Sequence, residues 1–365
     1  MQNGYTLTDI GAALGAVVVG DGDIVICEAA EPKDAGPTSL ALAMDPKYAQ
    51  DVQQGQASAA ALWMDADWQS FGLKGAILVP RARVAMAGLT AMLDPGPAIA
   101  PGIHPSAVID PSATIGAGAA IGPFVAIGAG VCIGDNARIA SHVSIADDTT
   151  LGNSVLLHAG VRIGRGVRMG HRVILHPGAV IGGDGFSFVT AEKSRAEAAR
   201  ETLGDSSAAT DQAWIRIHSL GSVVIGDDVE IGCNSCVDAG TIRPTRIAER
   251  TKIDNQVHVA HNCEIGRDCL FAGQVGIAGS AKIGNNVILG GQVGIADNIF
   301  VGDGVVAGGA SVVLSNVPAG RVLLGYPATK MDTQLSTYKA LRRLPRLTAQ
   351  VAELQKAVSK PDSND

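Results

Sequence analysis

The stretch IGAGAAIGPFVAIGAGVCI, residues 115–133, places an isoleucine at every sixth position and usually a glycine directly after it. The same six-residue rhythm of aliphatic residues runs from Ile103 to Ile181 without a missed step. It resumes at Ile225, slips by four residues at 243–246, and continues to Val301. An amphipathic α-helix would instead repeat its apolar residues at spacings of three and four, which are absent here.

This hexad predicts a coil of stacked rungs. Each six residues would form a short strand and a turn, and three sixes would close one triangular turn of a solenoid. The aliphatic residue would point inward and stack on its counterpart one turn away. A single rung cannot bury its own apolar face, so stability would accumulate between neighbouring rungs. The sequence therefore predicts a mainly β fold, a parallel β-helix of hexapeptide repeats.

Three regions depart from the hexad. Residues 1–100 mix helical and strand-like stretches, as in a small α/β domain, and end at a Pro/Gly-rich linker. A polar excursion at about 187–217 interrupts the β-helix domain, which we assign to 103–320. The tail at 329–360 carries an apolar stripe at helical spacing, and Pro345 predicts that it divides into two short helices. An exposed stripe of this kind favours symmetric self-association.

The bulk composition limits the classes of function. A net charge of -7 argues against a nucleic-acid-binding protein. No apolar run approaches the roughly 18–20 residues that a membrane span requires. The first residues carry no secretory signal, and six scattered cysteines do not form a disulfide framework. We therefore expect a cytoplasmic protein that neither spans a membrane nor binds nucleic acid.

The densest polar patch is DNQVHVAHN, residues 254–262. Its two histidines stand at positions that do not face the core, and Asp254 falls on the adjoining edge of the same rung. Acyl transfer to an amine requires a general base and donors for the oxyanion of the tetrahedral intermediate. A neutral imidazole suits the first role, and a carboxylate behind it would fix its tautomer. The hexad alone leaves open whether His258 and His261 are merely solvated turn residues.

Residues 254–262 resemble the active-site stretch of the UDP-3-O-acylglucosamine N-acyltransferases, a family of hexapeptide-repeat enzymes in lipid A biosynthesis. The resemblance covers the repeats well and the first hundred residues loosely. Further matching stretches are 179–188, 221–232, 273–280 and the turn at 325–328.

The resemblance implies a left-handed β-helix and a homotrimer whose active sites lie between subunits. It implies transfer of a (R)-3-hydroxyacyl group from acyl carrier protein to the 2-amino group of a UDP-3-O-acyl-glucosamine. A thioester donor can be attacked directly by the amine, so neither cofactor nor metal is expected.

Carried over position by position, the resemblance assigns catalytic roles to three residues. His261 matches the general base, Asp254 the acid that orients it, and Gly279 the glycine whose backbone N–H stabilises the oxyanion. Asn255 and His258, in the same stretch, are expected to contact substrate.

Several positions depart from the family pattern. Asn298 stands in the last polar turn, where a histidine is common, and we expect it to line the substrate site. Tyr48 matches the tyrosine of the uridine-stacking pair, but Leu42 occupies the aromatic position. The chain has Asp-Ala-Gly at 238–240, where the family usually has Asp-Arg-Gly.

Two groups of residues have competing interpretations. Phe186 and Phe188, where the hexad ends, either cap the excursion or line the acyl or sugar pocket. In the tail, basic residues either form a solvated helix face or steer the acidic carrier protein to the site. On the second interpretation the docking residues are Arg342, Arg343 and Arg346.

Two metal-like patterns receive plainer interpretations. His171 and His176, with His158 nearby, suggest the site of the hexapeptide-repeat carbonic anhydrases, but no third spacing matches, so we interpret them as turn histidines. Cys233 and Cys236 lack the second pair that a zinc site requires, so we interpret them as ordinary thiols.

Two rival functions remain at this point. One is a coenzyme A-dependent N-acetyltransferase acting on a nucleotide amino sugar, which donor identity would distinguish. The other is a non-catalytic repeat scaffold, which His261→Ala would distinguish from an enzyme.

Overall fold

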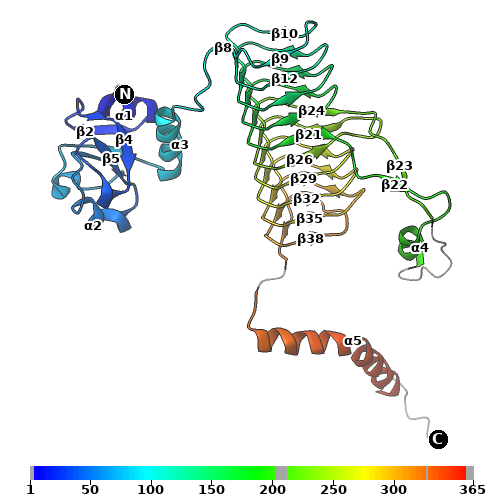
Figure 1. The fold of residues 1–365 in the computed structure, drawn as a ribbon. Helices are drawn as coiled ribbons and strands as arrows, with labels where there is room; N and C mark the ends of the chain where they lie inside the picture. The colour runs from blue at the N-terminus through cyan, green and yellow to red at the C-terminus, as the bar shows by residue number, and fades with distance from the viewer. Residues whose placement is uncertain (1–3, 203–211, 326–327, 359–365) are drawn as a thin grey trace, which may run out of the picture. The chain divides into compact units, whose positions relative to one another are not determined.

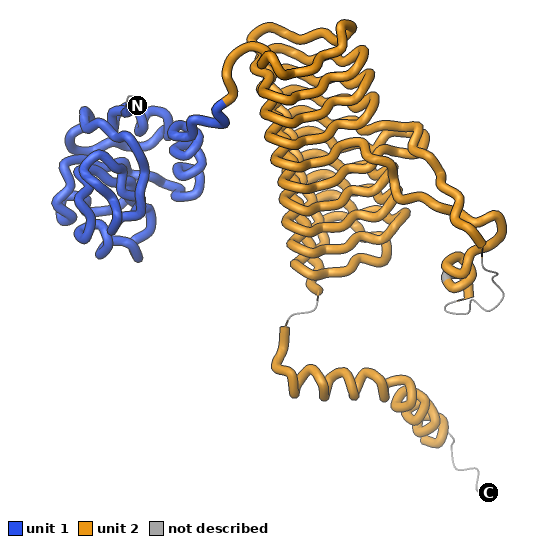
Figure 2. Tube along the Cα trace, viewed as in Figure 1, with its two compact units in different colours: residues 1–98 blue, residues 99–365 orange. Residues whose placement is uncertain are grey.

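The computed structural model describes residues 4–202, 212–325 and 328–358. The chain forms two compact units, residues 1–98 and residues 99–365 (Figure 2). The turn predicted at 325–328 lies partly outside the described residues. Within the described part of the chain, no helix is both long enough and apolar enough to cross a membrane.

The first unit is the predicted small α/β domain. Its sheet has the order β2-β7-β6-β5-β4, and only β2 runs antiparallel to its neighbour. Leu7 and Ile10 of α1 pack with Ile77 of the sheet and Leu89 of α3 in one buried cluster. The strands are β2 (Val17–Gly20), β4 (Glu28–Ala30), β5 (Ser39–Ala43), β6 (Ala59–Trp63) and β7 (Gly75–Val79). The helices are α1 (Leu7–Leu14), α2 (Ala49–Val52) and α3 (Ala82–Leu93).

The second unit contains a parallel β-helix running from β8 (Gly102–Ile103) to β39 (Val322–Leu323) (Figure 1). Its short strands stack into three parallel sheets of nine, eleven and ten strands. Each inward aliphatic residue lies beside its counterpart one coil later, as Ile121 does beside Ile139. These inward residues form one continuous buried core. The hexad prediction is confirmed, and the arrangement is consistent with a left-handed coil.

The sharp turns between the sheets explain which residue types occupy the turn positions of the hexad. The third residue of each turn repeatedly adopts positive φ, as at Gly118 (φ 70°) and Asn136 (φ 56°). Glycine enters this left-handed region freely, and asparagine and aspartate enter it more readily than other side chains. The small and amide residues between the aliphatic positions therefore set the sharp corners of the prism.

The polar excursion leaves the β-helix between β21 (Val180–Gly183) and β24 (Val223–Ile225). It is more ordered than a loop, because β22 (Phe188–Val189) and β23 (Ile215–Arg216) pair antiparallel and α4 (Arg195–Thr202) follows β22. In the coil that follows it, residues lie 22 positions before their partners in the next coil, as in Cys236 and His258, and later coils return to a spacing of 18, as in His258 and Gly276. The four extra residues come from the slip before β27 (Thr245–Ile247).

The tail is one helix, α5 (Met331–Val358), with Pro345 inside it and every residue exposed. The prediction of two short helices is therefore wrong. Proline removes one backbone hydrogen bond and crowds the preceding turn, which bends a helix without necessarily ending it. Figure 1 shows α5 bent along its length rather than divided.

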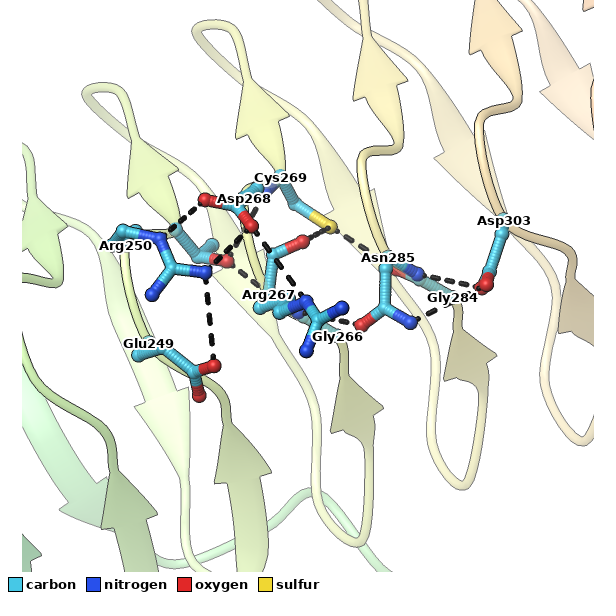
Figure 3. Close-up of polar contacts among 10 residues, drawn as sticks. Glu249, Arg250, Gly266, Arg267, Asp268, Cys269, Gly284, Asn285 and Asp303 are labelled. Carbon is cyan, nitrogen blue, oxygen red and sulfur yellow. Dashed lines mark hydrogen bonds and ion pairs between the residues drawn. The ribbon is translucent and has the colours of Figure 1, made fainter.

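Charged side chains tie successive coils together along one corner (Figure 3). The Arg250 guanidinium donates to both carboxylate oxygens of Asp268, at 2.6 and 2.8 Å. Arg172 binds Asp228 in the same two-point manner, at 2.6 and 2.7 Å. These arginines lower the pKa of both carboxyls. Because the pairs are solvent-exposed, they contribute modestly to the stacking of the coils.

Candidate active site

A groove opens on one face of the β-helix where outward side chains are missing. In the ten-stranded sheet, β29 (His258–Val259), β32 (Gly276–Ile277) and β35 (Gly294–Ile295) are neighbours. A side chain at Gly276 or Gly294 would meet no atom within 4 Å, so these glycines leave open space. The groove has a volume of about 670 Å³. Its lining includes Phe186, His258, His261, Gly279, Asn298 and Leu314.

A hydrogen-bond network fixes the ring of His261. Its Nδ1 lies 2.9 Å from Oδ1 of Asn262. Nδ2 of Asn262 donates to the Arg243 carbonyl at 3.1 Å, and Oδ1 accepts from the backbone N–H of Thr241 at 3.2 Å. A carbonyl can only accept and a backbone N–H can only donate, so the orientation of the Asn262 amide is determined.

This network sets the tautomer of the imidazole. Because Oδ1 of Asn262 is an acceptor, Nδ1 of His261 must carry the proton, which leaves a free lone pair on Nε2 of the neutral ring. A Cβ added at Gly279 would lie 2.9 Å from Nε2, and one added at Gly185 would lie 2.8 Å from Cβ of His261. The ring therefore fits between two glycines, with its basic nitrogen close to Gly279.

Asp238 is a buried carboxylate beside the groove, and the sequence analysis gave it no role. It ends β26 (Cys236–Asp238), and its Oδ2 lies 3.4 Å from Nε2 of His258. Burial raises the pKa of the Asp238 carboxyl, while the charges of His258 and His261 act in the opposite direction. One signal was present in the sequence. Ala260 and Ala278 follow the inward residues of the next two coils, so the carboxylate at this corner differs from its neighbours in those coils.

Asp254 does not meet His261 within the chain. It follows β28 (Lys252–Ile253) of the eleven-stranded sheet, whereas His261 follows β29 of the ten-stranded sheet. Asp254 lines a different groove of about 600 Å³, together with His176 and Glu230. Within one chain the two residues therefore stand at different corners, and Asn262 contacts Nδ1 of His261 instead. The orienting role of Asp254 stays a prediction.

The predicted substrate residues separate in the same way. Asn298 lines the His261 groove, and its Nδ2 donates to Asp297 at 3.2 Å. Asn255 lines the Asp254 groove, and its Oδ1 accepts from the backbone N–H of Cys233 at 2.6 Å. That bond joins successive coils, which gives Asn255 a structural role as well.

The two phenylalanines occupy neighbouring sites. Phe186 is 84% exposed and lines the His261 groove. Phe188 packs against it edge to face at 5.1 Å and lies beneath the Arg216 guanidinium. Phe188 lines a second pocket with Trp214, and Phe186 belongs to both. Both interpretations of the pair thus find support, since Phe186 reaches the groove and Phe188 holds it in place.

Other predicted residues lie on other parts of the chain. Tyr48 ends a short 3-10 helix, Pro46–Tyr48, of the first unit and is 40% exposed. Arg342, Arg343 and Arg346 are exposed on α5. Their expected contacts with uridine and with a carrier protein stay predictions.

The three histidines of the metal-like pattern do not share one site. His158 and His176 stack with ring centroids 5.0 Å apart, and His176 contacts Glu230 at 2.9 Å. Burial and the neighbouring His176 lower the pKa of His158. His171 lies elsewhere, with Nδ1 accepting from the backbone N–H of Asn153 at 2.9 Å. Cys233 and Cys236 are free, half-buried thiols.

Comparison with known proteins shows which families and proteins this chain resembles. Residues 244–279 match the bacterial transferase hexapeptide (six repeats) family, and residues 103–184 match the GMPPB C-terminal domain. The chain is 66% identical over 361 residues to a protein of Ruegeria pomeroyi named UDP-3-O-acylglucosamine N-acyltransferase, covering 99% of each. A protein of the same name from Paracoccus denitrificans is 63% identical over 355 residues and 97% of each chain.

More distant proteins agree with the fold. A Coxiella burnetii protein with the same name is 35% identical over 269 residues, or 74% of this chain and 73% of its own. Among solved structures, Arabidopsis UDP-N-acetylglucosamine acyltransferase superposes with a TM-score of 0.51 at 24% identity. That match covers 61% of this chain and 71% of the other, and it supports the β-helix architecture.

Proposed function

Because the chain belongs to the UDP-3-O-acylglucosamine N-acyltransferase family, we propose that it transfers a (R)-3-hydroxyacyl group in lipid A biosynthesis. The donor is acyl carrier protein, and the acceptor is the 2-amino group of a UDP-3-O-acyl-glucosamine. The observation that carries this proposal is the fixed tautomer of His261, whose free Nε2 lies beside Gly279 in an open groove.

The chemistry follows from this geometry. The acceptor amine attacks the thioester carbonyl, and Nε2 of His261 removes the amine proton as the C–N bond forms. The backbone N–H of Gly279 stabilises the negative charge on the carbonyl oxygen. The tetrahedral intermediate then collapses, the C–S bond breaks, and the leaving thiolate takes the proton from the imidazolium. Asn262 holds Nδ1 throughout, so the ring keeps one orientation.

The groove itself suits an acyl chain. Gly276 and Gly294 clear its floor, and Val312 and Leu314 give its lining an apolar end. Hydrocarbon transferred from water into such a lining is stabilised by the hydrophobic effect. We place the donated acyl chain here, with Asn298 and Phe186 contacting substrate.

We further propose a homotrimer in which Asp254 acts on the His261 groove of a neighbouring subunit. Asp254 borders the eleven-stranded face, whose outward residues include the exposed Leu270 and Ile288. Exposed apolar residues clustered on one face are typical of a surface buried on association. In this arrangement Asn255 also contacts substrate from the neighbouring subunit.

The remaining contacts are proposed on two grounds. The family resemblance assigns Tyr48 to stacking on uridine, and charge assigns Arg342, Arg343 and Arg346 on α5 to docking the acidic carrier protein. We propose that the reaction takes place in the cytoplasm and uses no cofactor.

Product analysis by mass spectrometry tests the proposal. Purified protein is given UDP-3-O-acyl-glucosamine with a panel of 3-hydroxyacyl carrier proteins or acetyl-coenzyme A. We expect N-acylated product from a hydroxyacyl carrier protein, its loss in His261→Ala, and its retention in His104→Ala, which removes an exposed histidine of the first coil. Turnover with acetyl-coenzyme A alone would favour the N-acetyltransferase, and no transfer from any donor would favour a scaffold.

A further inference from the structure

We propose that Asp238 is a positioning residue for this reaction, acting from the preceding coil on both histidines of the groove. The inference rests on the proposed acyl transfer and deepens it. It assigns the electrostatic partner of the base to a residue of the same chain, distinct from Asp254.

The backbone places Asp238 directly above the catalytic turn. β26 pairs with β29, with Val237 opposite Val259, so Asp238 lies over the residue that precedes His261 by one. On its other side the ladder shifts register after Ile181 so that Gly183 opposes Asp238. The Ala239 backbone N–H donates to the Gly183 carbonyl at 2.8 Å, which anchors this corner.

The side chain is nearly enclosed, since only 11% of it is exposed. An ionised carboxylate removed from water is strongly destabilising unless charged or hydrogen-bonding partners surround it. Its partner here is His258, with Nε2 3.4 Å from Oδ2. The next coils have alanine at this corner, and a buried acid is less favourable for folding than alanine. The acid therefore indicates a functional role.

Several titratable groups surround Asp238. His258 and His261 face it from the next coil, and Asp184 approaches it from the start of the excursion. Asp184 is itself opposed by Arg216, at 3.9 Å. Two thiols also feel the Asp238 charge, Cys236 on the same strand and Cys263 in the next coil. Burial raises the pKa of each, and the Asp238 charge raises it further.

The catalytic consequence concerns the imidazolium. When Nε2 of His261 takes the amine proton, a positive charge forms on a half-buried ring. A fixed negative charge one coil away stabilises that cation without reorganising during the reaction. The same carboxylate holds the ring of His258 against the wall of the groove.

Asp238→Asn tests this role, because it removes the charge and keeps the shape. We expect kcat to fall by roughly tenfold to a hundredfold, and the acidic limb of the kcat/KM profile to move to lower pH. Asp268→Asn is the matched control, since it removes an exposed carboxylate from another corner. It should leave both the rate and the profile unchanged.

A second measurement does not depend on turnover. The chain has eight histidines, so their ring carbon signals can be resolved by NMR. In Asp238→Asn we expect the His258 ring signals to move from their parent positions, because Nε2 loses the carboxylate 3.4 Å away. If the parent protein transfers no acyl group, the proposed function fails while these signals still decide the role of Asp238.

Two results would overturn the inference. One is a set of His258 ring signals that does not change in the folded variant. The other is a loss of kcat that is equal at every pH, which would indicate a structural role only.

Discussion

Replacing Gly279 by alanine should disable the base without unfolding the protein. The new Cβ would lie 2.9 Å from both Cε1 and Nε2 of His261. Comfortable contacts begin near 3.5 Å, so the ring must withdraw by about 0.6 Å or more. Gly185 blocks the opposite side, because a Cβ there would already lie 2.8 Å from Cβ of His261. The Asn262 contact must then stretch or tilt.

The size of the effect follows from this displacement. Misplacing a reacting group by about 1 Å costs on the order of 100-fold in rate. We therefore expect kcat/KM of Gly279→Ala to fall by about 100-fold, or about 2.7 kcal/mol of transition-state stabilisation. Gly279 is not among the residues with positive φ, so alanine fits its backbone and the melting temperature should stay close to that of the parent protein.

Gly36→Ala, in the first unit, is the control. A Cβ at Gly36 meets only the Ser39 hydroxyl, at the ordinary distance of 3.6 Å, and Gly36 does not line the groove of His261. Steady-state kinetics by mass spectrometry and thermal unfolding are measured for both variants. Activity of Gly279→Ala within threefold of the parent would refute the reasoning, and so would an equal loss in Gly36→Ala.

Three further outcomes follow from the same geometry. Mixed trimers of Asp254→Ala and His261→Ala, each inactive alone, should regain about a quarter of parental activity if each site joins two subunits; no recovery would place Asp254 outside the neighbouring site. Asn262→Ala should lose at least about tenfold in kcat because the tautomer is no longer fixed, whereas Asn262→Asp, which still accepts from Nδ1, should retain more activity. Burial raises the pKa of Cys263 to about 12 and also raises that of Cys269, so at pH 8 a thiol reagent should modify these two only after unfolding.

The hexad predicted the scaffold because its physics is local and repetitive. Each inward aliphatic residue packs on its counterparts in the neighbouring coils, so the inward residues from Ile121 to Ile181 and from Ile225 to Val301 follow from the spacing. The tail was harder to predict, because a proline inside a helix bends or ends it depending on the turns around it. Here α5 continues through Pro345.

The sequence predicted contacts in the site only between residues that lie one coil apart. His261 and Gly279 differ by eighteen positions and meet, as the Ser280 backbone N–H confirms by donating to the His261 carbonyl. Asp254 precedes His261 by seven positions, which moves it to another corner. Asn262 was missed because its network depends on Thr241, just before the four-residue slip, and on Arg243, within it, and the periodic pattern could not place either residue.

The departures from the six-residue repeat lie around His261, and this arrangement favours a catalytic function over a purely structural one. The slip supplies the carbonyl that orients Asn262, and the excursion brings Gly185 against His261. The missing side chains at Gly276 and Gly294 open the groove beside them. Each departure weakens the repeat, since it gives up packing or ladder regularity that the other coils keep. A scaffold protein would gain no function from placing these irregularities around the His261 ring. An acyltransferase gains a base of fixed tautomer in an open groove.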